Sequence, residues 1–161
     1  MRRMFFFEIT GLAAGRLAVV TRPRGGDQLQ QEMTDLRAAG YDVLVSALTP
    51  PEEAEHGLTQ EGTAAQAAGL RYRALTIPDY GLPDAGTLEV PLRELAAELK
   101  AGAAIGVHCG QGIGRAPLIV ASLMRHTGFS MEDAFARIRT ARGRRVPDTE
   151  EQKLWVKNLS I

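Results

Sequence analysis

Short apolar runs alternate along this chain with longer segments in which apolar positions recur every three or four residues. The runs are typical of buried strands, and we predict strands over residues 4–9, 16–20, 41–46, 72–77 and 103–107. The periodic segments predict helices over residues 26–39, 63–68, 87–100, 116–124, 131–141 and 149–159, with a further short helix that begins at residue 50. This alternation predicts an α/β fold of three layers, with a parallel-rich central sheet and helices on both faces.

Length and charge narrow the class of protein. The 161 residues suffice for a proper core and show no linker or repeat, so we expect a single domain over residues 1–161. The 19 basic and 19 acidic residues cancel, which argues against binding to nucleic acid or to a membrane surface. The apolar stretch near the N-terminus is too short for a signal peptide or a bilayer span. One cysteine excludes an internal disulfide and fits the cytoplasm, and the preference for arginine over lysine suggests a bacterial genome rich in GC.

The single cysteine, Cys109, stands between the predicted strand 103–107 and the predicted helix 116–124, in a glycine-rich loop that ends at Arg115. The residues between them are Gly110, Gln111, Gly112, Ile113 and Gly114. Such a loop at a helix N-terminus offers free N–H groups and positive potential to an anion such as phosphate. The same field favours a thiolate at Cys109, and the planar guanidinium of Arg115 matches two phosphate oxygens. An inert buried cysteine that ends a strand is the alternative interpretation.

The order of His108, Cys109, five further residues and Arg115 resembles the signature loop of the protein tyrosine phosphatase superfamily. The chain is similar to the compact dual-specificity type, near the kinase-associated-phosphatase branch found in bacteria. This resemblance implies hydrolysis of phosphomonoesters through a phosphocysteine, with Cys109 as nucleophile, Arg115 and the loop as phosphate ligands, and His108 as a supporting residue. It also implies phosphorylated protein or peptide substrates in a shallow pocket, and neither a cofactor nor a metal ion.

A second segment, residues 77–84, resembles the mobile acid loop of the same superfamily, although Ile77 stands where tyrosine-specific members carry tryptophan. The resemblance makes Asp79 the general acid, which protonates the leaving oxygen and later takes a proton from the hydrolytic water. Asp84 also follows a proline and is the alternative acid, or else the N-cap of the next helix. A plain Pro-Asp turn is the interpretation without catalysis.

Two further positions bear on turnover. Gln152, early in the last predicted helix, matches a glutamine that places the hydrolytic water in many members of the superfamily; an exposed helix glutamine is the alternative. Ala116 departs from the serine or threonine of the superfamily, whose hydroxyl donates to the cysteine sulfur and helps it leave. Ala116 therefore supports a second hypothesis, a slow enzyme or a pseudophosphatase that binds phosphorylated ligands with little turnover.

One basic cluster lies near the C-terminus and consists of Arg137, Arg139, Arg142, Arg144 and Arg145. In the predicted fold this cluster borders the mouth of the site, where it would favour acidic peptides, phosphoinositides or RNA ends. A solvated helix end is the alternative. A rhodanese-like or arsenate-reducing protein is disfavoured by Asp79 and by the lack of a second cysteine. The sequence leaves the oligomeric state open.

Overall fold

The computed structural model describes residues 4–161 and contains a five-stranded sheet in the order β1-β2-β5-β3-β4. Strands β2, β5, β3 and β4 run parallel, and β1 pairs antiparallel with β2 at one edge. The connection between β1 and β2 is short, and a parallel pair would need a long crossover, so only the antiparallel pairing is open to them. The strands are β1 (Phe6–Glu8), β2 (Arg16–Val20), β3 (Val43–Ser46), β4 (Arg71–Ala74) and β5 (Ala104–His108).

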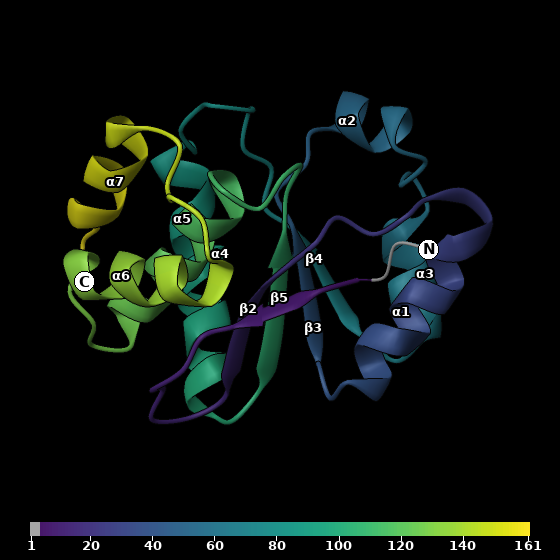
Figure 1. Ribbon diagram of the computed structural model, residues 1–161, viewed down its shortest axis with the longest axis horizontal. Helices are drawn as coiled ribbons and strands as arrows, with labels where there is room; N and C mark the ends of the chain where they lie inside the picture. Colours follow the sequence, from purple (N-terminus) through teal and green to yellow (C-terminus); the bar gives the residue numbers. More distant parts are fainter. Residues whose placement is uncertain (1–3) are drawn as a thin grey trace.

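Helices cover both faces of the sheet, which stands between two groups of them in Figure 1. The group on the right comprises α1 (Leu29–Ala38), α2 (Pro50–Glu55) and α3 (Glu61–Ala67), with a 3-10 turn (Gly26–Gln28) before α1. The group on the left comprises α4 (Ala85–Lys100), α5 (Arg115–His126), α6 (Met131–Arg142) and α7 (Glu150–Lys157). The predicted three-layer α/β fold with a parallel-rich sheet is therefore confirmed. Within residues 4–161, no helix is both long and apolar enough to cross a membrane.

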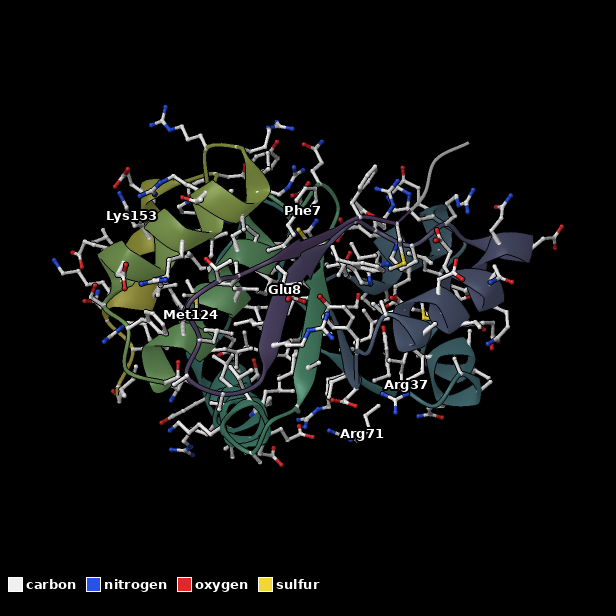
Figure 2. The ribbon with its side chains drawn as sticks, turned by 60° about the horizontal axis from the view of Figure 1, so that its bottom comes forward. Phe7, Glu8, Arg37, Arg71, Met124 and Lys153 are labelled. Carbon is white, nitrogen blue, oxygen red and sulfur yellow. The ribbon has the colours of Figure 1, made fainter. Side chains whose placement is uncertain are left out.

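The central strand β5 shows why both faces need a cover. Its Ile105 and Val107 belong to the core beneath α4 to α7, whereas Ala104 belongs to the core beneath α1 and α3. Phe7 and Glu8 of β1 lie between the two groups of helices in Figure 2, and Phe7 packs against the first of these cores. Strands that are buried on both faces read as continuous apolar runs, which is the pattern that predicts them here.

Two predicted boundaries differ from the structure near the site. The strand predicted over residues 72–77 is shorter as β4, but the chain stays extended after it. The N–H groups of Leu75 and Ile77 still donate to backbone carbonyls at the end of β3, at 2.8 and 3.0 Å. The helix predicted over residues 63–68 begins earlier, at Glu61, a carboxylate that is almost fully buried. A charged residue in a core is not part of an apolar pattern, so the pattern misses this first turn.

The parallel strands bring three connecting segments to one edge of the sheet. Strands β3, β4 and β5 all end at that edge because they run in the same direction. They are followed by α2, by the segment 75–84 and by the loop that leads into α5, and these lie together at the top of Figure 1. In open α/β sheets, ligands bind just outside the carboxyl ends of the strands.

Candidate active site

The loop from Cys109 to Gly114 joins β5 to α5. Cys109 is buried, and the N–H of Gly112 donates to its Sγ at 3.2 Å. Gly112 has a φ of +75°, which a residue with a side chain rarely adopts, and a Cβ there would also lie 3.2 Å from Val19. Because α5 begins directly after the loop, at Arg115, the loop adjoins the positive end of a helix. This arrangement suits an anion bound beside the cysteine sulfur.

Arg115 is buried, and its guanidinium is held by three acceptors. Two of its nitrogens donate to the two carboxylate oxygens of Glu52, at 2.7 and 2.8 Å. One of these nitrogens also donates to the carbonyl of Ile77 at 3.0 Å, and Asp79 Oδ1 lies 3.4 Å from the other. Burial is the largest single influence and lowers the pKa of Arg115. The hydrogen bonds to Glu52 and the negative charges of Cys109, Glu52 and Asp79 together exceed it, so the net shift of the pKa is upward. The guanidinium therefore remains charged and lies in a fixed plane next to the loop.

Glu52 is a site residue that sequence reasoning misses. The sequence around it predicts a helix start, and the structure has a capping box there: the N–H of Glu52 donates to Thr49 Oγ1, and Glu52 Oε1 accepts from the Thr49 N–H. The hydrogen bond from Arg115 holds the pKa of the Glu52 carboxyl at about 2. The local pattern reveals the cap, but the contact with Arg115 joins residues 63 positions apart.

Replacing Glu52 by glutamine is expected to destabilise the protein by about 2 kcal/mol at pH 7, because the buried charge of Arg115 loses its bidentate partner. The carboxyl has a pKa of about 2 in the fold against an ordinary value of 4.5. The stabilisation is therefore complete above about pH 4.5 and is lost as the pH falls toward 2. Thermal unfolding at several pH values measures this, with a decrease in Tm of roughly 4–8 °C at pH 7.

The matched control for this variant is Glu55→Gln, because Glu55 is an exposed carboxylate on the same helix. Its Tm should stay within about 2 °C of the wild-type value. A Glu52→Gln protein as stable as wild type at pH 7 would contradict the role of the pair. So would a difference that persists unchanged down to about pH 2.

Asp79 lies in the segment after β4 and borders the same cavity as Cys109. Its side chain is 59% exposed, and its Oδ1 accepts the N–H of Tyr80 at 3.1 Å. Tyr80 has a φ of +57°, an uncommon conformation for a residue with a side chain and one that recurs at functional sites. Asp84 lies instead at the N-cap of α4, where it accepts a backbone N–H at 3.0 Å. The structure thus brings Asp79 rather than Asp84 to the cysteine.

Two residues near the start of α7 lie beside the site, Asp148 just before the helix and Gln152 in its first turn. Gln152 is fully buried, and its Nε2 donates to the carbonyl of Gly81 at 3.4 Å, which links α7 to the segment that carries Asp79. The alternative of an exposed glutamine at this position is therefore wrong. Asp148 lines the cavity, and a side chain at Gly114 would collide with its carboxylate. Burial, and then the charge of Asp79, raises the pKa of Asp148.

The basic cluster near the C-terminus is largely engaged in contacts within the protein. Arg142 donates to two carbonyl oxygens of the loop from Cys109 to Gly114, at 3.3 and 3.0 Å, and its guanidinium lies 4.4 Å from the ring centre of Phe7. Arg137 and Arg139 donate to backbone carbonyls elsewhere. None of the five cluster residues lines the cavity. Arg142 therefore supports the loop from outside, a role that the sequence does not reveal. Arg22 contacts a third carbonyl of the loop at 3.2 Å.

The cavity has a volume of about 240 Å³ and is lined mainly by polar groups. Its lining includes the predicted residues Cys109, Gly110, Gln111, Ile113, Gly114, Arg115 and Asp79. It also includes Glu55, His56 and Tyr80, which sequence reasoning misses. Three predicted residues, His108, Gly112 and Gln152, are buried and do not line it. No group of His, Cys, Asp and Glu side chains in residues 4–161 is arranged to hold a metal ion.

Comparison with known proteins shows which family this chain belongs to. Residues 18–129 match a family described as "Polymorphic toxin system, DSP-PTPase phosphatase". The chain is 30% identical over 97 residues to a tyrosine-protein phosphatase of Autographa californica nuclear polyhedrosis virus, and this alignment covers 58% of the chain and 55% of the viral protein. The chain spans about half the length of the curated relatives that it matches.

Solved structures show the same fold. Kinase associated phosphatase is similar with a TM-score of 0.85 and 20% identity, over 97% of this chain and 93% of that one. Tk-PTP in its active form is similar with a TM-score of 0.70 and 25% identity, over 88% of each chain. Because the identity to kinase associated phosphatase is only 20%, this similarity shows the fold alone.

Proposed function

Because this chain belongs to the DSP-PTPase family of phosphatases, we propose that it is a cysteine-dependent phosphomonoesterase that acts on phosphorylated proteins or peptides. One observation carries the proposal: Cys109, Arg115 and Asp79 border a single cavity. A phosphoryl group in that cavity would have a nucleophile, a fixed cation and a proton donor on its different sides. The other groups of the site hold these three in place.

In the first step, the thiolate of Cys109 attacks phosphorus while the bond from phosphorus to the ester oxygen breaks. The carboxyl of Asp79 gives its proton to the departing oxygen, so that an alcohol or phenol leaves instead of its anion. The loop N–H groups and Arg115 stabilise the charge on the remaining phosphoryl oxygens. The products are a phosphocysteine and an ionised Asp79.

In the second step, water attacks the phosphocysteine. The ionised Asp79 accepts a proton from that water, the bond from sulfur to phosphorus breaks, and Cys109 leaves as a thiolate. The N–H of Gly112 already donates to Sγ at 3.2 Å and so stabilises the charge that returns to the sulfur. Gln152 lies close to the loop at Gly114, which supports a role in placing the water.

The charges of the site support protein or peptide substrates over the alternatives. The alternatives of phosphoinositides and RNA ends depend on a basic cluster at the mouth, and that cluster lies outside the cavity, with Arg142 engaged by the loop itself. The formal net charge of zero also offers no general attraction to nucleic acid. A nucleophilic cysteine must stay reduced, so the proposed enzyme works in a reducing compartment such as the cytoplasm.

Hydrolysis of para-nitrophenyl phosphate in the presence of EDTA tests the proposal. We expect turnover that EDTA leaves unchanged and that vanadate inhibits, followed by release of phosphate from phosphotyrosine and phosphothreonine peptides. Absence of turnover on all of these substrates, with vanadate still bound, would favour a pseudophosphatase instead. Faster release of phosphate from a phosphoinositide or an RNA end than from any peptide would assign the substrate to that class instead.

The pseudophosphatase is the second candidate because of one residue. Ala116, in the first turn of α5, is fully buried and has no hydroxyl to donate to the sulfur. The structure supplies a backbone donor, the N–H of Gly112. We therefore expect a working enzyme that is slow in its second step.

Replacing Ala116 by serine is expected to raise kcat about tenfold, because a hydrogen bond to a charged sulfur contributes about 1.5–3 kcal/mol and Gly112 already provides one donor. In wild type, breakdown of the phosphocysteine should limit kcat, so rapid mixing with para-nitrophenyl phosphate should show a burst of para-nitrophenol. The burst should shrink in Ala116→Ser. The matched control is Ala121→Ser, which adds a hydroxyl one and a half turns further along the same helix and should leave kcat unchanged. An unchanged kcat and no burst in either protein would refute the slow second step.

A further inference from the structure

A buried contact between a histidine and a carboxylate lies directly before the loop from Cys109 to Gly114. His108 is the last residue of β5, and its Nε2 is in hydrogen-bond contact with Oε2 of Glu61, in the first turn of α3. The two side chains are 0% and 1% exposed. Of the contacts between basic and carboxylate side chains among residues 4–161, this is the only one in which both side chains are fully buried. No step of the proposed mechanism uses it.

The geometry of the strand explains how α3 comes to support the loop. Successive side chains of a strand point to opposite faces of the sheet. Cys109 belongs to the core beneath α4 to α7. His108, one residue earlier, therefore faces the layer of α1 and α3, where Glu61 meets it. The imidazole thus lies immediately before the proposed nucleophile but is reached from the other side of the sheet.

This pair costs free energy that an apolar pair would not, because both groups lose their water. The second carboxylate oxygen of Glu61 is satisfied by the Tyr72 hydroxyl, which donates to it at 3.3 Å. Burial, and then the charge of Glu61, raises the pKa of Tyr72, so the hydroxyl remains a donor. On His108, Nδ1 is buried and has no hydrogen-bond partner in the described part of the chain. Glu61 is therefore the polar contact that sets the orientation of the imidazole.

We propose that Glu61 is a positioning residue for the nucleophile. Its carboxylate fixes the orientation of His108 with Nε2 protonated, and it stabilises the positive charge of the imidazolium next to Cys109. A cation at that point favours the thiolate over the thiol. The other titratable groups that face the pair are Glu53 of α2 and Tyr72 of β4. The inference rests on the proposed function in taking Cys109 as the nucleophile, but it concerns ionisation of the thiol and not turnover.

Alkylation of Cys109 by iodoacetate tests this inference, because the reagent reports the thiolate and requires no turnover. The rate is measured from about pH 4 to pH 9 in wild type and in Glu61→Gln. We expect the midpoint of the rate profile to rise by roughly one pH unit in the variant, so that alkylation below the midpoint is about tenfold slower. His108→Asn should produce a shift of similar size. The double variant should shift no further, since Glu61 acts through His108.

The matched control is Glu53→Gln, which removes a nearby carboxylate that acts on His108 through its charge alone. Its midpoint should move by less than about 0.3 unit. If Glu61→Gln alkylates more slowly at every pH but keeps the same midpoint, Glu61 has a purely structural role and the proposal is overturned. Additive shifts of the midpoint in the double variant would also overturn it. If Glu61→Gln does not fold, the test uses His108→Asn alone. An unchanged midpoint of the alkylation profile in His108→Asn would then overturn the proposal. A wild type that is inactive but shows these shifts would refute the phosphatase function and leave this inference standing.

Discussion

Replacing Cys109 by serine is expected to reduce turnover of para-nitrophenyl phosphate by more than about 10⁴-fold, while binding of inorganic phosphate stays within about threefold of wild type. Serine differs from cysteine by one atom, so the loop and its N–H groups keep their arrangement. A hydroxyl, however, does not ionise near neutral pH, and no phosphoenzyme can form at a useful rate. Steady-state assays and phosphate titration by calorimetry measure the two quantities separately.

The phosphoenzyme provides the control for this prediction. Wild type that is mixed with substrate and quenched rapidly should carry phosphate on Cys109, and mass spectrometry of a proteolytic digest should find it there. The serine variant treated in the same way should carry none. Phosphatase activity that survives the substitution, or phosphate that is found on another residue, would refute the proposed nucleophile.

Replacing Asp79 by asparagine is expected to lower kcat by roughly 10²–10⁴-fold, the usual contribution of general acid catalysis. The loss should be larger for alkyl phosphates than for aryl phosphates, because a good leaving group needs its proton less. Asparagine has nearly the same shape as aspartate and can still accept the N–H of Tyr80, which the aspartate accepts at 3.1 Å. A series of phosphate esters with leaving groups of graded acidity therefore measures proton transfer rather than folding.

Asp84 and Asp148 offer matched controls for this variant. Asp84 caps α4, and asparagine is an equally good N-cap, so Asp84→Asn should leave both stability and kcat unchanged. Asp148 shares the cavity with Asp79, and burial raises its pKa. A loss of kcat that appears in Asp148→Asn or Asp84→Asn, with Asp79→Asn nearly as active as wild type, would transfer the role of the acid.

The architecture of this protein follows from local signals. Apolar runs bounded by turn residues predict the inner strands β2, β3 and β5, which are almost fully buried because helices cover both faces of the sheet. The edge strands β1 and β4 are partly exposed. The glycine-rich loop after β5 is predicted equally well, since Cys109, Gly112 and Arg115 are near one another in the chain and a strand, loop and helix in succession leave little choice of geometry. The segment with Asp79 is recognisable for the same reason, because its prolines and glycine constrain a short stretch of backbone.

The partners of these residues are decided only by the tertiary structure. Glu52 meets Arg115 across 63 positions, and Glu61 meets His108 across 47. In the sequence Glu52 looks like an ordinary residue of a helix start, where acidic side chains are favoured, and Glu61 lies just before a predicted helix. Their contacts exist because parallel strands end at one edge of the sheet and deliver α2 and α3 beside the loop.

The sequence by itself therefore determined which segments form strands and helices, and which short loops carry the sulfur, the guanidinium and the acid. The choice between Asp79 and Asp84, the burial of Gln152 and the arrival of Asp148 at Gly114 depended on how the helices pack. Local propensity acts over a few residues, whereas these contacts form only once two apolar cores have closed over both faces of the sheet. For this reason the reacting groups can be identified from the sequence. The groups that position them and favour their charged forms can be identified only from the tertiary structure.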